Sequence, residues 1–156
     1  MIRMDEIAAL VDRAEIEDVV TAVFDMTDAK NWPVCQELFD DEVAVDFTSL
    51  NGGEPSTVTS AQLVDGWNKG LHAKKQSFHM VSNYAINVDG AEAGVTAKGH
   101  AYNLLDADLG GGIWEVWGVY RLRLVRQAEG WKVTALAFEA KHSRGDASVR
   151  THTLQA

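Results

Sequence analysis

Two side chains in this sequence are of the types that form a general base. Asp28 lies at the end of an amphipathic stretch, beside Thr27 and one helical turn after Phe24, where the apolar stripe should still face a core. His79 alternates with large apolar residues in the segment SFHMVSNY. A carboxylate that accepts a hydrogen bond from one imidazole nitrogen fixes the tautomer and leaves the other nitrogen free to take a proton. Asp28 and His79 are therefore our candidate catalytic pair.

Each member of this pair also has a simpler interpretation. Asp28 could be a last-turn acid that meets solvent or a nearby backbone N–H, and His79 could be a histidine held in the core or at an interface. A buried, ionised Asp28 would need a hydrogen-bonding or charged partner, because burying a lone carboxylate costs several kcal/mol. Contact between the two side chains is the observation that separates these interpretations.

Other polar and aromatic residues could complete a cavity around the pair. His100, in the segment KGHAYNLL, is our candidate for a second polar group, although a solvent-facing histidine fits that strand equally well. Aromatic side chains would suit an apolar substrate, and they suit a hydrophobic core just as well. The expected lining residues are Phe24, Trp32, Phe47, Trp67, Tyr102 and Trp114.

No pattern typical of a metal or cofactor site accompanies these residues. The sequence has no zinc-ligand spacing, phosphate-binding glycine loop, nucleophile elbow or dinucleotide fingerprint. The glycines at 110–112 indicate a turn between strands, since neither Lys-Ser/Thr nor a helix follows them. Cys35 is the single cysteine, which excludes an intrachain disulfide and favours a small buried side chain. We expect chemistry without a metal or a cofactor.

Composition narrows the class of partner. The chain has 156 residues, and its 23 acidic and 14 basic side chains give a net charge of −9, which opposes binding to phosphate backbones and anionic bilayers. Asp5, Glu6 and Asp12 interrupt the N-terminal stretch where a signal peptide needs an apolar core. We therefore expect a cytoplasmic protein that binds neither nucleic acid nor membrane.

Hydrophobic periodicity predicts helices first and a meander of strands afterwards. A long helix is expected from Asp12 to Trp32, with a short helix after Pro33. The other expected elements are a strand at 43–47, a loop at 49–60, a helix at 61–73 and antiparallel strands at 76–88, 91–105, 113–125 and 131–142. This order predicts one α+β domain over residues 1–142, with helices on one face of a curved sheet, and a C-terminal tail over residues 143–156.

The order and spacing of five segments resemble a known family. The segments are AEIEDVVTAVFDMTDAKNW, ELFDDEVAVDF, SFHMVSN, GVYRLRLVR and GWKV. Together they are similar to the SnoaL-like group of the nuclear transport factor 2-like superfamily, which includes scytalone dehydratase and lindane dehydrochlorinase. The resemblance covers about residues 5–142. It implies a cone-shaped fold in which the N-terminal helices pack over the concave face of a curved antiparallel or mixed sheet.

The resemblance also implies roles for individual residues. In the dehydratase and the dehydrochlorinase an Asp at the end of the long helix pairs with a His on the first long strand, and these positions correspond to Asp28 and His79. The tyrosines with which scytalone dehydratase holds the departing water correspond to Thr27 and Phe47, so its particular dehydration is not implied. The dehydratase's second histidine aligns roughly with the stretch from His100 to Asn103, and His100 is the residue there to which the resemblance extends that role. The Tyr and protonated Asp of ketosteroid isomerase are not evident in this sequence.

The leading functional hypothesis is a cofactor-independent lyase of the dehydratase or β-elimination type, acting on a small apolar cyclic substrate. An isomerase, a retro-aldol lyase or a polyketide cyclase would begin with the same proton transfer. A non-catalytic module for small-molecule binding or assembly is the alternative from a different class. The fold usually oligomerises through its exposed sheet face, where Trp117 and Val119 are expected to point outward, so we expect a homodimer or homotrimer.

Overall fold

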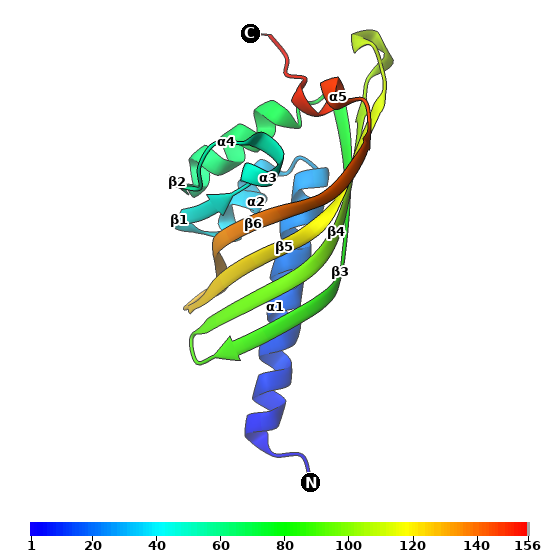
Figure 1. Ribbon diagram of the computed structural model, residues 1–156. Helices are drawn as coiled ribbons and strands as arrows, with labels where there is room; N and C mark the ends of the chain where they lie inside the picture. The colour runs from blue at the N-terminus through cyan, green and yellow to red at the C-terminus, as the bar shows by residue number, and fades with distance from the viewer. Residues whose placement is uncertain (156) are drawn as a thin grey trace.

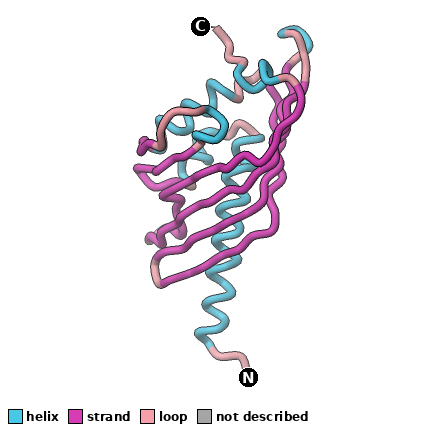
Figure 2. The backbone as a smooth tube through the Cα atoms, viewed as in Figure 1, coloured by secondary structure: helices cyan, strands magenta, loops and turns pink. Residues whose placement is uncertain are grey.

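A six-stranded mixed sheet dominates the computed structural model, which describes residues 1–155. The strands are β1 (Phe39–Asp46), β2 (Ser56–Thr59), β3 (Lys75–Asp89), β4 (Glu92–Leu105), β5 (Ile113–Gln127) and β6 (Gly130–Gly145). Their order across the sheet is β2-β1-β6-β5-β4-β3, and only the β1–β6 pairing is parallel. Figures 1 and 2 show the long strands bending around one helix. The predicted α+β class with a curved sheet under N-terminal helices is confirmed.

The long helix α1 (Met4–Asp28) fills the inner side of the sheet through its second half. Its buried side chains recur at the spacing of one helical face and are Ile16, Val20, Val23, Phe24 and Thr27. Burying an apolar side chain of this size stabilises the fold by roughly 1.5–3 kcal/mol. The helix therefore ends at Asp28 with its last turn held against the sheet.

The start of α1 differs from the expected start. The helix begins at Met4, eight residues before the expected Asp12, because Glu6 accepts a hydrogen bond from the Arg3 backbone N–H and caps the first turn. The early turns project beyond the sheet (Figure 1). Apolar side chains of these turns, such as Ile7 and Leu10, are exposed. The apolar periodicity of the sequence therefore identifies only the part of the helix that packs against the sheet.

Four short helices close one end of the sheet. They are α2 (Trp32–Glu37), α3 (Thr48–Asn51), α4 (Ser60–Gly70) and α5 (Ala147–Thr151), and a 3-10 turn, η1 (Ala107–Leu109), follows β4. The expected loop at 49–60 contains α3 and strand β2, which pairs with β1 and so satisfies its backbone groups. No helix within residues 1–155 is long and apolar enough to cross a membrane.

The tail expected over residues 143–156 is tied to this end of the molecule. β6 continues to Gly145, and α5 then places Val149 in a fully buried position. The Arg150 guanidinium lies over the Trp114 ring at 5.7 Å and donates a hydrogen bond to Asn51. Ala156 lies outside the described residues.

Inner and outer sheet faces carry different side chains. On β4 and β5 the inner face includes two neighbouring glycines, Gly99 and Gly118, which pair across the strands. A Cβ at Gly99 would lie 2.1 Å from the Tyr120 ring, and one at Gly118 would lie 2.5 Å from the Phe138 ring. Two large rings can lie flat on the sheet there only because these positions have no side chain.

Candidate active site

Asp28 and His79 are in direct contact in the folded chain. The His79 Nδ1 atom lies 2.6 Å from the Asp28 Oδ1 atom, and both side chains are mostly buried, with 13% and 17% of their side-chain surface exposed for His79 and Asp28. An ionised carboxylate only accepts hydrogen bonds, so Nδ1 carries a proton, and in the neutral form of the ring Nε2 is the free nitrogen. We call this pair the dyad.

Two further donors fix the Asp28 carboxylate. The backbone N–H of His79 donates to Oδ2 at 2.7 Å, and the Ser77 hydroxyl donates to Oδ1 at 2.8 Å. Burial by itself would raise the pKa of Asp28, but hydrogen bonding and charge from the His79 ring, with these two donors, hold the pKa below its usual value. The carboxylate thus stays ionised and oriented at neutral pH.

Local structure explains why these residues meet. Asp28 is the last residue of α1, and Ala29 already caps the helix with its N–H on the Asp25 carbonyl. Ser77 and His79 are two apart on β3, so they share one face of the sheet, and the burial pattern places that face inward. The end of α1 and the inner face of β3 therefore hold the Asp28 carboxylate and the His79 imidazole in place.

A small cavity of about 80 Å³ lies beside the His79 ring. Its walls are apolar and aromatic apart from Thr27, His79 and Tyr120, and the lining residues are Phe24, Thr27, Phe47, Trp67, Leu71, His79, Tyr120 and Leu136. The Thr27 hydroxyl is engaged, since it donates to the Val23 carbonyl at 2.7 Å. Polar chemistry in the cavity therefore falls to His79 and Tyr120.

The larger depression of the molecule lies elsewhere. It measures about 810 Å³ and crosses the outer face of the sheet, with Ala44, Thr96, Arg121 and Ala137 among its lining residues. Neither Asp28 nor His79 lines this depression, so its larger volume does not make it the candidate active site.

The expected lining residues separate into two groups. Phe24, Phe47 and Trp67 line the cavity, whereas Trp32 packs against the core from α2 and Trp114 is buried farther along β5 under Arg150. Placing Tyr102 in the cavity was wrong. Tyr102 pairs with Phe78, which is 59% exposed, and directly opposed residues share a face.

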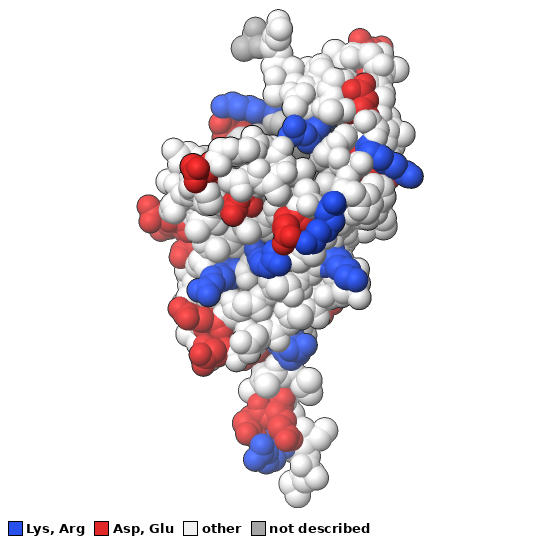
Figure 3. Space-filling model, viewed as in Figure 1, with Lys and Arg blue, Asp and Glu red and all other residues white. Residues whose placement is uncertain are grey.

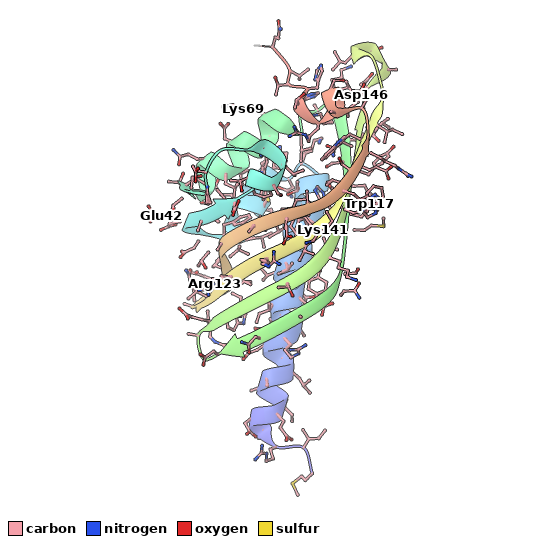
Figure 4. The ribbon with its side chains drawn as sticks, viewed as in Figure 1. Glu42, Lys69, Trp117, Arg123, Lys141 and Asp146 are labelled. Carbon is pink, nitrogen blue, oxygen red and sulfur yellow. The ribbon has the colours of Figure 1, made fainter. Side chains whose placement is uncertain are left out.

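The expected role of His100 as a second polar group in the cavity was also wrong. His100 lies on the outer face, where its Nε2 is 3.0 Å from a Glu115 oxygen and its ring stacks on Trp117 with centroids 4.4 Å apart. Figure 4 shows Trp117 pointing away from α1. The inward positions on either side of His100 are small, Gly99 and Ala101, and Gly99 makes room for the Tyr120 ring.

Two site residues were missed in the sequence. Ser77 could be identified from the sequence, because it lies two positions before His79. In a regular strand, two side chains at this spacing lie on the same face of the sheet. Tyr120 has no comparable signal in the sequence, since a tyrosine in a strand resembles any other core aromatic.

Residues 1–155 contain no cluster of three or more His, Cys, Asp or Glu side chains that could hold a metal ion. The dyad has one carboxylate and one imidazole, which is fewer than the three protein ligands typical of a catalytic zinc site. The arrangement is instead that of an imidazole oriented by a carboxylate and facing an apolar cavity.

Comparison with known proteins gives one family and several similar folds. The family model described as "SnoaL-like domain" matches residues 8–137, and no curated protein matches the sequence. The Kfla4162 protein from Kribbella flavida has a similar structure, with a TM-score of 0.83 and 26% identity over 87% of this chain and 95% of that one.

Two solved structures with lower identity share the fold. One, described as a candidate scytalone dehydratase from Novosphingobium aromaticivorans, has a TM-score of 0.72 and 18% identity over 95% of this chain and 92% of its own. The other is the hexachlorocyclohexane dehydrochlorinase LinA-type3 from Novosphingobium barchaimii LL02, with a TM-score of 0.72 and 16% identity over 97% and 99% of the two chains. The family match spans most of the sequence, and this chain belongs to the SnoaL-like domain family.

Proposed function

We propose that the protein is a cofactor-independent lyase in which His79, oriented by Asp28, removes a proton beside an activating group. The observation that carries this proposal is the 2.6 Å contact between Asp28 and the His79 ring at the wall of an apolar cavity. The neutral ring takes the proton on Nε2, and the carboxylate stabilises the imidazolium that forms. The elimination named in the descriptions of the two similar structures, of water or of hydrogen chloride, is chemistry that such a base can begin.

The proposed reaction balances without a cofactor. His79 takes a proton from carbon, the electron pair forms a double bond to the neighbouring carbon, and the leaving group departs from that carbon with its bonding pair. For a hydroxyl leaving group the imidazolium returns the proton, so the products are an alkene and water. A positioned general base supplies about 10²–10⁴-fold of the rate, and orientation in a dry cavity supplies more.

The cavity defines the class of substrate that we propose. Its walls are aromatic and aliphatic, and none of its described lining residues is Lys or Arg, which favours a small, uncharged, largely apolar ring compound. At about 80 Å³ the cavity is smaller than typical ligand pockets of about 300 Å³ or more. Binding a ring therefore requires movement of lining side chains, and Trp67 and Leu71, both partly exposed, are the ones we expect to move.

A β-hydroxy ketone tests the proposal. We expect the protein to convert 3-hydroxycyclohexanone to cyclohexenone and water, followed by the ultraviolet absorbance of the conjugated product. His79→Ala should lower kcat about 10²–10⁴-fold. His100→Ala is the matched control, because His100 lies on the other face of the sheet. Equal rates for the wild type and His79→Ala, measured also as α-proton exchange in D₂O, would contradict a general base and favour the binding module.

We also propose that the protein is a homo-oligomer that associates through the outer face of the sheet. Phe78 and Met80 are 59% and 53% exposed there, next to the stacked His100 and Trp117 rings. Lys and Arg lie among Asp and Glu on this face (Figure 3), a mixture that can complement itself in a second copy. Sedimentation should give a dimer or trimer that Trp117→Glu dissociates, and a wild-type monomer at micromolar concentration would contradict the proposal.

A further inference from the structure

The first turns of α1 have an apolar face that stays exposed in the folded chain. Residues 1–11, which we call the N-terminal segment, are all exposed. Met4, Ile7 and Val11 recur at the spacing of one helical face, and Leu10, which is 62% exposed, lies beside them. A contiguous apolar patch of this kind is typical of a surface that binds another molecule.

This exposed face is not a continuation of the face that packs on the sheet. Ile7 is nine residues before the buried Ile16, and Val11 is nine residues before the buried Val20. Nine residues make about two and a half turns of an α-helix, so each exposed side chain points to the opposite side of α1 from its buried counterpart. Covering the exposed face therefore requires a surface that approaches α1 from its other side.

The position of α1 prevents its own chain from supplying that surface. The helix is continuous from Met4 to Asp28, and it is fixed where it leaves the sheet. The Asp12 carboxylate accepts two hydrogen bonds from the Arg126 guanidinium, at 2.8 and 2.7 Å, and Arg13 donates to the Ile86 carbonyl at 2.7 Å. Figure 1 shows the remaining turns running away from the rest of the molecule. The partner surface must belong to another molecule.

The large depression on the outer face of the sheet is suited to an apolar helix face. It measures about 810 Å³, and none of its lining residues comes from α1. Small residues from β1, β4 and β6 form much of its surface, among them Ala44, Gly94, Ala135 and Ala137. Sites of about 300–1,000 Å³ can bury most of a drug-sized ligand, so this depression can accept several aliphatic side chains.

The charges beside the two surfaces are complementary. The depression is lined by two guanidinium groups, Arg121 and Arg123, and by a single carboxylate. In the N-terminal segment the carboxylates of Asp5 and Glu6 share one guanidinium, that of Arg3, at 3.5 and 3.6 Å. Acidic atoms gather at the projecting end of α1 in Figure 3. Complementary charges of this kind favour one orientation of two associating surfaces.

We propose that the N-terminal segment of one copy of the chain docks by its apolar face into the outer-face depression of a second copy. Each copy gives one segment and receives one, which closes the assembly and leaves no segment or depression empty. This inference rests on the outer-face oligomer proposed above, and it identifies the part of the chain that fills the depression.

Paramagnetic NMR on a mixed sample locates the segment. Half of the protein carries a nitroxide at Ala9→Cys, and the other half is untagged and ¹⁵N-labelled, so only contacts between copies are observed. Position 9 lies on the other side of the helix from Ile7, and the native Cys35 is buried, so the tag reacts at position 9 without blocking the apolar face. We expect the amide signals of Thr96 and Arg121 to broaden in the untagged copies. Adding Leu10→Glu to the tagged copies should abolish the broadening.

Sedimentation measures the contribution of the apolar face. Leu10→Glu changes a side chain that is exposed in the single chain, so the fold is retained, and we expect association to weaken at least about 10-fold. Thr96→Trp, which fills the depression from an exposed position, should have a similar effect. Val34→Glu is the matched control, because it places the same charge at an exposed apolar position on α2. Its association should equal that of the wild type.

The possible outcomes separate this inference from the other proposals. An oligomeric wild type that shows no broadening at the depression, or that Leu10→Glu leaves intact, overturns the inference while the outer-face oligomer stands. A wild-type monomer overturns both. Sedimentation of the protein with phosphatidylcholine vesicles, with the signals of the depression unchanged, would identify a bilayer as the partner of the segment and would also overturn the inference. The dyad is tested independently, by the turnover of His79→Ala.

Discussion

Two clusters of titratable side chains lie near the start of β3, and they differ in the groups that stabilise their charges. The dyad has a carboxylate for its histidine. The second group, which we call the tail cluster, consists of His72, Lys75 and His152. His72 Nε2 and His152 Nδ1 are 2.9 Å apart, and the fully buried Lys75 ammonium donates to the carbonyls of Arg150 and His152 at 3.1 and 2.9 Å.

The difference lies in the solvation of charge. In the dyad, hydrogen bonds and an opposite charge outweigh burial and lower the pKa of Asp28, so the ionised form is stable. In the tail cluster, burial with the charges of Lys30 and Arg150 lowers the pKa of Lys75 to about 8. The same strand therefore carries the proposed general base at His79 and, at Lys75, a buried cation whose ammonium donates to carbonyls of the C-terminal segment.

The largest expected effect comes from removing the charge of the dyad. Asp28→Asn keeps the shape of the side chain but cannot stabilise an imidazolium, so we expect kcat for 3-hydroxycyclohexanone to fall about 100-fold or more. Asp25→Asn, on the exposed side of α1, is the matched control. Wild-type turnover in Asp28→Asn would contradict a catalytic role for the dyad.

Asp28→Asn should also alter acid stability. The folded pKa of Asp28 lies below its unfolded value, so its contribution to the free energy of unfolding is present above about pH 4 and is lost as the pH falls through the folded pKa. Urea titrations at pH 3 and pH 7 should show a smaller pH dependence in the variant. An identical dependence in both proteins would contradict the assigned shift.

Lys75→Met should change how stability responds to alkaline pH. Because the folded pKa of about 8 lies below the unfolded value near 10.5, the unfolded chain binds more protons between these values, and stability rises with pH there by at most about 1.4 kcal/mol per pH unit. The variant should lose this rise, as measured by urea unfolding at pH 7.5, 8.5 and 9.5. The neighbouring Lys74→Met, at a half-exposed position, should keep it.

The smallest expected effect is a pH-dependent loosening of the C-terminal segment. Burial first, and then the charges of Lys75, His152 and Lys30, lower the pKa of His72. Protonation of His72 is thus favoured in the opened state, and the stability of the closed segment falls as the pH drops below about 6.5. Hydrogen exchange at residues 147–152, corrected for intrinsic rates, should be faster at pH 5 than at pH 8, and His72→Gln should remove the difference. Equal protection at both pH values would show that α5 is held by Val149 and Arg150 alone.

The sequence was sufficient for the long strands, for the packed part of α1 and for the pairing of Asp28 with His79, but it missed α3, β2 and α5 and did not define the rest of the site. The period of the apolar residues defined the four long strands, and Asp28 with His79 followed from residue chemistry and the family resemblance. The phase of β4 could not be inferred, because Gly99 and Ala101 face inward while His100 and Tyr102 face outward, the reverse of the usual pattern of large residues inside. Gly99 leaves room for the Tyr120 ring of the neighbouring strand β5, which is a contact that no local sequence pattern contains.

¹⁵N NMR of the imidazole rings at pH 8, in the wild type and Asp28→Asn, reports the tautomer on which the proposed base depends. We expect His79 in the wild type to carry its proton on Nδ1, with Nε2 bare toward the cavity, and Asp28→Asn to lose this preference while the His72 and His152 signals stay unchanged. A wild-type His79 that carries its proton on Nε2, or a tautomer that Asp28→Asn leaves unaltered, would contradict the assignment of the dyad as the general base.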